Sequence, residues 1–248
     1  MVASTASRPP SSLAGEAYAV VRQRILRGDI GLGQVVSRRK LAAELNMSFL
    51  PVSEALLRLE FEGLLESRPR AGTRVRIPSP EDVKGHYVLR EALEVVAAMR
   101  FATLASPIER AELQALACRV DALSTQFDRP LYQSAHHKFH ARIAQGGRCP
   151  ALLEAIEKTN ALASVWFCVK RQANSDVPPT RHQELAEALV SGEESRAAHA
   201  IRQHIAVGLQ HALTVLQPYF KLRKATGKTF FRSDKKLRPP VAEPGKAH

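Results

Sequence analysis

Residues 37–75 read SRRKLAAELNMSFLPVSEALLRLEFEGLLESRPRAGTRV, and this stretch decides the fold of the N-terminal part of the chain. After Ser37 the apolar residues recur at helical spacing, and after Ser48 they do so again. Asn46-Met47, between the two stripes, predicts a tight turn. Ser48 can accept a hydrogen bond from the first turn of the helix that follows it. The stretch therefore begins with two short helices joined by a turn.

The second helix is expected to run from Ser48 to about Glu62. Pro51 falls in its first turn, where the missing N–H costs little, and Gly63 is expected to end it. The residues expected to face inward are Val52, Ala55, Leu56 and Leu59.

A β-hairpin is expected directly after this helix. Residues 64–77 form two short alternating segments joined by Pro-Arg-Ala-Gly, which places Gly72 at the tip. Residues 16–30, before the quoted stretch, show helical spacing at Tyr18, Val21 and Ile25. Three short helices with a tight turn before the third, followed by a basic hairpin, predict a winged helix-turn-helix domain over residues 16–78. Such a domain needs no catalytic residues.

The next domain is expected to begin at the PSPED sequence of residues 78–82. Ser79 can cap a helix with Pro80 at its first position, and the acidic residues that follow favour the positive helix end. Only helical periodicity is found from there to Gln217, which predicts an all-α bundle of six to seven helices over residues 79–217. The fold class is therefore mainly α. The expected helices span roughly 81–105, 107–125, 130–145, 150–172, 180–190 and 193–217.

The formal net charge of +12 is unevenly distributed. Residues 1–78 hold 12 Lys/Arg against 7 Asp/Glu (+5), residues 79–217 hold 15 against 15 (0), and residues 218–248 hold 9 against 2 (+7). Basic ends around a neutral middle are typical of a protein that contacts nucleic acid through its ends. Residues 1–15, polar and rich in Pro and Ser, and residues 218–248 are expected to be a disordered N-terminus and a basic flexible tail.

The composition argues against a membrane or secreted protein. Apolar residues make up 45% of the chain, but the longest run, broken by one serine, spans only residues 161–169 and is too short for a bilayer. The N-terminus lacks the apolar core of a signal peptide. The three cysteines include no CxxC pair. A reducing, cytoplasmic location without membrane association is therefore expected.

Residues 136–140 read HHKFH, a possible metal-binding pattern. On a helix His136 and His140 lie one turn apart on the same face, whereas His137 points elsewhere. Two imidazoles at this spacing can bind one ion, but helices also carry solvent-facing histidines that have no special function. The stretch alone leaves both interpretations open.

The order and spacing of these motifs resemble the GntR transcriptional regulators, specifically the FadR subfamily with its all-helical FCD effector domain. The N-terminal likeness lies in ILRGDIGLG, SRRKLAAELNMS and PVSEALLRLEFEGLLESRPRAGTRV. The C-terminal likeness lies in LREALE at 89–94, FH at 139–140, and the segment from His182 to His204 that contains AEALVSGEESRAAHAIRQH. The resemblance covers roughly residues 16–217. It implies a homodimeric transcription factor, more often a repressor, that binds a double-stranded DNA operator and responds to a small organic or sugar acid.

The resemblance also implies DNA-contact residues, with a departure. Where the family usually reads Ser-Arg-Thr-Pro-x-Arg-Glu, residues 48–54 read SFLPVSE, so both DNA-contacting arginines are absent. Phe49 and Leu50 could pack on thymine methyl groups or form a dimer contact, or DNA binding could have decayed in this chain. The candidate DNA-contact residues are Arg38, Arg39, Ser48, Phe49, Leu50, Ser53, Arg70 and Gly72.

A metal site is implied as well. In the metal-binding members of the family, an Asp four residues before the His of the FH pair joins that His and two histidines from later helices. This chain has His at the Asp position. The candidate ligands are therefore His136, His140, His182 and His204. The histidines expected to lie outside the site are His137, His199 and His211.

Four imidazole ligands favour zinc, with nickel, copper or iron as alternatives, over magnesium or calcium, which prefer oxygen. Without a carboxylate ligand the ion would keep its full charge of +2, which should strengthen its attraction for an anionic effector. The presence of His136 in place of the family's Asp could equally abolish metal binding.

Three questions of function stay open at this point. Arg90, in the LREALE motif, could bind an effector carboxylate through a bidentate pair, or it could form an ion pair with a glutamate of the chain. The metal could itself be the signal, without an organic effector. A metallohydrolase is the least favoured alternative, since the chain has no HExxH motif and no acidic residue near the histidines at a spacing that suggests a general base. We therefore expect a regulator and not an enzyme.

Overall fold

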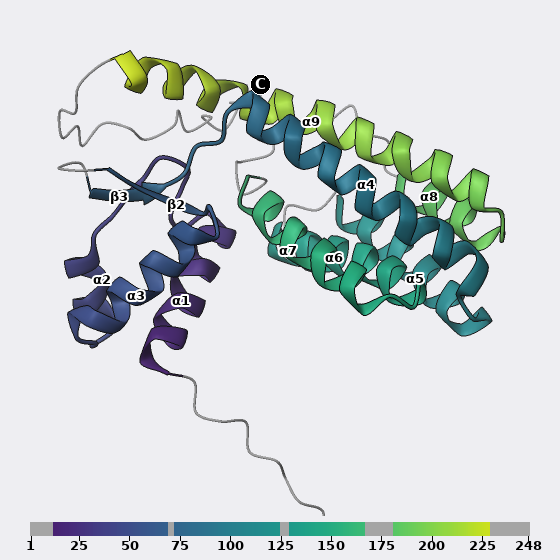
Figure 1. The fold of residues 1–248 in the computed structure, drawn as a ribbon, viewed down its shortest axis with the longest axis horizontal. Helices are drawn as coiled ribbons and strands as arrows, with labels where there is room; N and C mark the ends of the chain where they lie inside the picture. The colour runs from purple at the N-terminus through teal and green to yellow at the C-terminus, as the bar shows by residue number, and fades with distance from the viewer. Residues whose placement is uncertain (1–11, 69–71, 125–128, 167–180, 229–248) are drawn as a thin grey trace, which may run out of the picture.

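The computed structural model describes residues 12–68, 72–124, 129–166 and 181–228. These residues form a small N-terminal domain of helices and strands beside an elongated helical bundle (Figure 1). Within this part of the chain, no helix is both long enough and apolar enough to cross a membrane. The expected order of a winged helix-turn-helix followed by an all-α domain is confirmed.

The N-terminal domain consists of three helices and a three-stranded antiparallel sheet with β3 in the centre. Its elements are α1 (Leu13–Arg27), β1 (Val35–Val36), α2 (Arg38–Glu44), α3 (Phe49–Phe61), β2 (Leu65–Arg68) and β3 (Gly72–Val75). The strands β2 and β3 are the predicted hairpin, but Gly72, which was expected at its tip, is the first residue of β3 and lies opposite Arg68. The short strand β1 was not expected, because two residues are too few to show an alternating pattern.

The core of this domain forms between α1 and α3. The four residues predicted to face inward on α3 are all buried, and they pack with Ala17, Val21 and Ile25 of α1. Gly63 follows the helix with a φ of 76°, a left-handed conformation that favours glycine and ends the helix as expected.

Ser48 occupies the predicted N-cap position of α3 but does not cap it with its side chain. The usual donor to an N-cap hydroxyl is the backbone N–H of the second or third helical residue. In α3 the third residue is Pro51, which has no N–H. The expected side-chain cap is therefore wrong, and proline at this position accounts for it.

The C-terminal domain contains six helices among the described residues. They are α4 (Pro80–Leu104), α5 (Pro107–Ser124), α6 (Arg129–Gly146), α7 (Pro150–Trp166), α8 (Arg181–Val190) and α9 (Glu194–Lys228). Ser79 caps α4 as predicted, and Asp82 accepts a hydrogen bond from the Ser79 backbone N–H, which completes a capping box. Part of the helix expected over 150–172, residues 167–172, lies outside the described residues.

The longest helices of this domain, α4 and α9, lie side by side along the bundle (Figure 1). The bundle core includes the fully buried aromatic residues Phe101 and Phe139, together with Leu189 and Ile201. The core therefore contains residues of α4, α6, α8 and α9, the helices on which the predicted metal and effector residues lie.

The helix α9 continues to Lys228, although the sequence predicted a flexible tail from residue 218. Proline inside a helix removes one backbone hydrogen bond and usually bends or ends the helix. Here Leu216 and Phe220, on either side of Pro218, are buried in the bundle core and keep the chain helical. The predicted tail is thus wrong for 218–228, and residues 229–248 lie outside the described residues.

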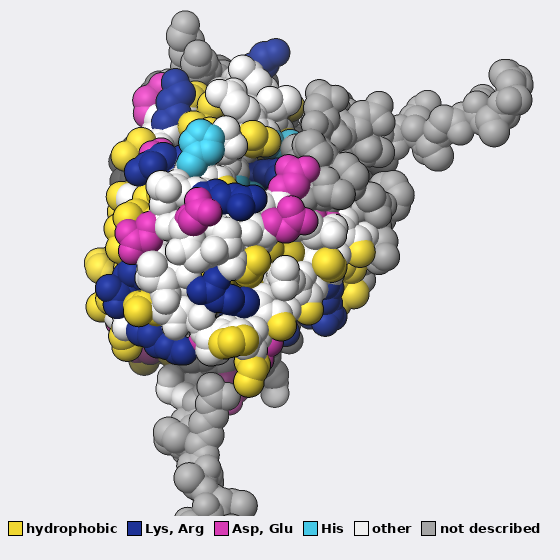
Figure 2. Space-filling view, turned by 90° about the vertical axis from the view of Figure 1, so that its right-hand side faces the viewer, with side chains coloured by type: hydrophobic (Ala, Val, Ile, Leu, Met, Phe, Trp, Pro, Cys, Tyr) yellow, Lys and Arg dark blue, Asp and Glu magenta, His cyan; other side chains and the backbone are white. Residues whose placement is uncertain are grey.

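The surface charge of the bundle is mixed. Figure 2 shows the end of the molecule that lies away from the N-terminal domain, with Lys and Arg side chains interspersed with Asp and Glu. A face without a patch of one sign is poorly suited to bind the phosphate backbone of nucleic acid. This agrees with the zero net charge counted for residues 79–217.

Candidate metal centre and DNA-contact residues

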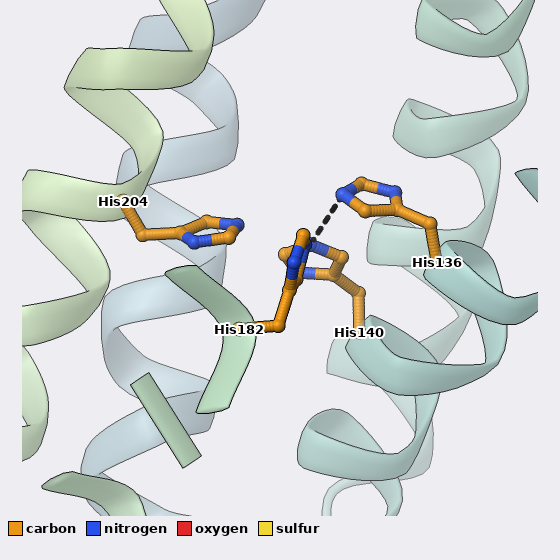
Figure 3. A group of neighbouring side chains, drawn as sticks. All are labelled: His136, His140, His182 and His204. Carbon is orange, nitrogen blue, oxygen red and sulfur yellow. Dashed lines mark hydrogen bonds between the residues drawn. The ribbon is translucent and has the colours of Figure 1, made fainter. Parts of the chain in front are cut away.

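The structure brings together the four histidines that were predicted to bind a metal. His136 and His140 project from neighbouring turns of α6, His182 from α8 and His204 from α9, and their rings point into one space (Figure 3). One ring nitrogen from each histidine can be chosen so that all four lie within 4.8 Å of one another. Three of the side chains are buried, and that of His136 is partly buried.

The geometry of this histidine cluster fits a transition metal ion. The Nε2 atoms of His136 and His140 are 3.2 Å apart, close to the ~3.3 Å expected for two nitrogens bound tetrahedrally to one ion at 2.0–2.1 Å. In addition, His182 Nε2 and His204 Nδ1 are buried without a hydrogen-bond partner. Because buried polar atoms normally have partners, an ion between the rings would satisfy both atoms.

One carboxylate holds the His182 imidazole. Asp121 Oδ1, on α5, lies 2.7 Å from His182 Nδ1, and the same carboxylate accepts hydrogen bonds from the backbone N–H groups of His182 and Gln183. It therefore caps the first turn of α8 and also directs the ring, so that Nε2 is left to face the cluster. A carboxylate behind a histidine ligand is the common arrangement around protein-bound metals.

A second carboxylate stands behind His140. Glu94 Oε2, on α4, lies 2.7 Å from His140 Nδ1, while Arg90 Nε donates a hydrogen bond of 2.7 Å to Glu94 Oε1. Arg90 also lies over the Tyr87 ring, with its guanidinium carbon 4.9 Å from the ring centroid. The structure thus shows the ion pair that the sequence left open as one role for Arg90.

Burial favours the neutral form of three of these imidazoles, those of His136, His182 and His204. Desolvation, more than any other effect, lowers the pKa of His136 and His204 well below the ordinary value, and it also lowers the pKa of His182 despite the opposing hydrogen bond to Asp121. Neutral imidazole is the form that binds a metal. Burial alone would raise the pKa of Glu94, but Arg90 and His140 outweigh it and hold this pKa at about 2.

Arg181, at the start of α8, adds a positive charge beside the cluster. Its guanidinium group donates a hydrogen bond to the backbone carbonyl of His204, and its Nε atom is buried without a partner. At Gly208 the helix α9 packs closely against Tyr87 of α4 and against Arg181. A Cβ atom on Gly208 would lie 3.3 Å from the Tyr87 ring and 3.6 Å from Arg181 Nη2.

Sequence reasoning missed Asp121, Glu94 and Arg181. Most of the residues that these three contact are distant in sequence, as with Asp121 and His182, which are 61 residues apart. Only the i to i+4 spacing of Arg90 and Glu94 could have indicated part of the arrangement.

The other histidines lie outside the cluster. His199 is exposed on α9, and His137 and His211 are partly exposed. None of the three belongs to the group of ligand atoms found in the described part of the chain. His86 of α4, which the sequence did not single out, is buried, and its desolvation lowers its pKa to about 4.

The predicted DNA-contact residues lie on the turn-helix segment and the hairpin. Phe49 and Leu50, at the start of α3, are 55% and 67% exposed, and the Ser53 hydroxyl donates to the Phe49 carbonyl at 2.9 Å. On α2, Arg39 is exposed and Arg38 is partly exposed. The remaining three are Ser48, which is exposed before α3, Gly72, which begins β3, and Arg70, which lies outside the described residues.

Family models match both domains of the chain. Residues 13–75 match the model described as bacterial regulatory proteins, gntR family. Residues 86–207 match the FCD domain. These ranges cover the N-terminal domain and the bundle helices that carry the four histidines.

Two curated relatives align over most of their length. The chain is 30% identical over 203 residues to a protein of Paenarthrobacter nicotinovorans named "Probable D-xylose utilization operon transcriptional repressor", covering 80% of this chain and 88% of that protein. It is 24% identical over 216 residues to the HTH-type transcriptional repressor RspR of Escherichia coli K12, covering 83% of this chain and 91% of that protein.

Solved structures share the fold. A GntR transcriptional regulator from Rhodococcus sp. RHA1 superposes with a TM-score of 0.69 at 23% identity, covering 81% of this chain and 97% of that one. The E. coli protein McbR/YncC gives a TM-score of 0.64 at 22% identity, covering 84% of this chain and 99% of that one. At this level of identity the likeness establishes the arrangement of helices and strands.

Proposed function

The chain belongs to the gntR family of bacterial regulatory proteins and carries an FCD domain, and on this premise we propose that it is a repressor controlled by a metal-dependent pocket in its helical domain. Family and relatives are DNA-binding transcriptional regulators and not enzymes. The proposed ligand is a small organic or sugar acid, and its binding changes the affinity for a DNA operator. Such a protein acts on chromosomal DNA in the cytoplasm.

The observation that carries the proposal is the convergence of His136, His140, His182 and His204. Four imidazoles with ligand atoms within 4.8 Å of one another, two of which also have a buried ring nitrogen without a partner, form a donor set suited to a divalent transition metal, zinc above all. When bound, the ion would supply a positive centre, and a carboxylate of the ligand would join the four imidazoles as a fifth ligand.

The protein's own charges favour an anion at this place. Glu94 and Asp121 hold two of the imidazoles, and Arg90 and Arg181 lie beside them. The two carboxylates and the two guanidinium groups cancel in formal charge, so the region keeps the positive charge of the ion. Arg181, whose Nε is unpartnered, is better placed than the paired Arg90 to contact a ligand carboxylate.

Contacts at the far end of α9 give a route from this pocket to the DNA-binding domain. This helix carries His204 and, about five turns later, Arg223. The Arg223 guanidinium donates to the backbone carbonyl of Ile77, in the linker before α4, and lies 3.7 Å from Asp82. A ligand that shifts α9 would therefore move the linker and change which arrangement of the two domains is populated.

Metal analysis of purified variants tests the site. We expect His140→Ala and His204→Ala each to lose stoichiometric zinc. The matched controls are His137→Ala on α6 and His199→Ala on α9, which should keep it. Thermal stabilisation by a panel of small carboxylic and sugar acids should then occur only in zinc-loaded protein. Full zinc content in both the His140 and His204 variants would contradict the proposal.

A homodimer is part of the proposal, because a two-fold operator needs two recognition helices. The outward side of α4 supports it, since Val88, Leu89 and Val96 are 68%, 48% and 47% exposed on one side of that helix. Exposed apolar groups in such a row favour a protein contact. Light scattering should give twice the chain mass, and Val88→Glu should reduce it to that of a monomer.

The same measurements separate the alternatives. If operator affinity follows zinc content and no acid changes it, the ion itself is the signal. A metallohydrolase would need a general base beside the ion. Among the described residues, the two carboxylates that contact the cluster are already engaged, Asp121 with His182 and Glu94 with Arg90 and His140.

A further inference from the structure

The outward face of α3 is apolar. Phe49, Leu50 and Leu57 are 55%, 67% and 64% exposed, and helical spacing places them on one side of the helix. Ser53 lies between them, but its hydroxyl donates to the Phe49 carbonyl. The hydroxyl proton is thus already used within the helix.

No guanidinium group reaches this face from α3. The only arginine of the helix, Arg58, is turned toward α1, where its guanidinium carbon lies 3.9 Å from the centroid of the Tyr18 ring. Arg58 also pairs with Glu62 at 3.2 Å. Glu54, exposed at the edge of the face, can only accept hydrogen bonds when ionised. Since guanine presents two acceptors in the major groove, these α3 side chains cannot read it.

Exposed positive charge lies on the preceding helix, α2, instead. Arg39 is exposed in the first turn of α2, and the Lys40 side chain beside it is 78% exposed. The tight turn at Asn46, with φ of 51°, joins α2 to α3. An apolar helix preceded by a basic one suits a DNA major groove, in which the thymine methyl is the apolar group and the phosphates lie on both sides.

We propose that Phe49 and Leu50 read the operator through the 5-methyl groups of thymine, so that each half-site carries a T·A pair opposite the start of α3. This inference rests on the proposed operator binding and names the feature that is recognised. The methyl group packs against the Phe49 ring, and Leu50 adds to the same apolar surface. Arg39 and Lys40 contribute through phosphates, without regard to sequence.

The test begins with selection of duplexes from a randomised pool by the full-length, zinc-loaded protein. Thymine should be enriched at the step opposite α3. In the selected duplex, uracil at that step removes only the methyl group and should weaken binding about fourfold, equivalent to about 0.8 kcal/mol. Phe49→Ala should lose this difference. Phe61→Ala is the matched control, because Phe61 is 93% exposed at the other end of the same helix and should keep the difference.

The outcomes separate this inference from the proposed function. Selected duplexes with guanine at that step, or with equal affinity for thymine and uracil, would overturn methyl reading while leaving operator binding intact. Self-association that Phe49→Ala abolishes, together with no thymine enrichment, would assign the face to a protein contact and also overturn it. If no duplex is enriched at all, the proposed operator binding fails with it.

Discussion

Replacing Glu94 by Gln should both destabilise the bundle and weaken metal binding. In the structure one oxygen of this buried carboxylate accepts a hydrogen bond of 2.7 Å from Arg90 Nε, and the other oxygen lies 2.7 Å from His140 Nδ1. Gln keeps the shape and one acceptor but removes the charge. Arg90, only 4% exposed, would then be a buried cation without its counter-ion.

The magnitude follows from that burial. Breaking a buried ion pair by removing one partner costs about 3 to 5 kcal/mol, and because Gln retains an acceptor we expect a loss at the lower end, about 3 kcal/mol. For a protein of this size that corresponds to a melting temperature lower by about 6 to 12 °C. Because Gln would hold the His140 ring less firmly than Glu94 does, the affinity of the site for zinc should fall about 10- to 100-fold.

The control is Glu91→Gln, one turn away on the same helix. Glu91 pairs with Arg202 at 3.6 Å, but the two side chains are 51% and 54% exposed, so the change should cost less than about 1 kcal/mol. Calorimetry of zinc-free protein and zinc titration against a chromophoric chelator measure the two effects separately. Equal melting temperatures for the Glu94 and Glu91 variants would refute the buried ion pair. Unchanged zinc affinity in Glu94→Gln would refute the role of Glu94 in orienting the His140 ring.

Four further outcomes are expected. His136→Asp should keep zinc but bind organic acids more weakly, since a carboxylate ligand removes one positive charge; calorimetric titration of the loaded protein measures this. Arg223→Ala should leave zinc and acid binding intact and reduce the effect of the acid on DNA affinity; an undiminished effect would exclude the α9 route. The Glu109 carboxylate accepts a hydrogen bond from the Ser106 backbone N–H, and this bond contributes most to lowering the Glu109 pKa to about 2. Glu109→Gln should therefore lower the free energy of unfolding by about 1 to 2 kcal/mol at neutral pH. Because folding lowers this pKa, the ionised carboxylate stabilises the folded protein above pH 4.5, the ordinary pKa, and this stabilisation is lost as the pH falls toward 2. Urea unfolding should therefore show the difference in stability between wild type and variant shrinking in acid. Removing residues 229–248, with 5 Lys/Arg against 2 Asp/Glu, should make the salt dependence of DNA affinity shallower, and an unchanged slope would show that this segment does not contact phosphates.

The local structure of this chain could be predicted from its sequence. The Ser79 capping box, the inward stripe of α3 and the helix end at Gly63 all depend on residues no more than a few positions apart. The one-turn spacing of His136 and His140 was likewise visible, because helical geometry alone places both rings on one face. The order of these motifs also predicted the family.

Tertiary packing decided the rest. Asp121 reaches His182 across 61 residues, and Arg223 reaches Ile77 across 146. The helix α9 persists through Pro218 because residues around it are buried against other helices, which outweighs the local preference for a break. Periodicity and capping concern neighbours within one or two turns, whereas the position of a carboxylate behind an imidazole depends on how separate helices pack. The sequence by itself therefore determined most of the elements and the four candidate metal ligands, and only the packed bundle decided which charges surround them.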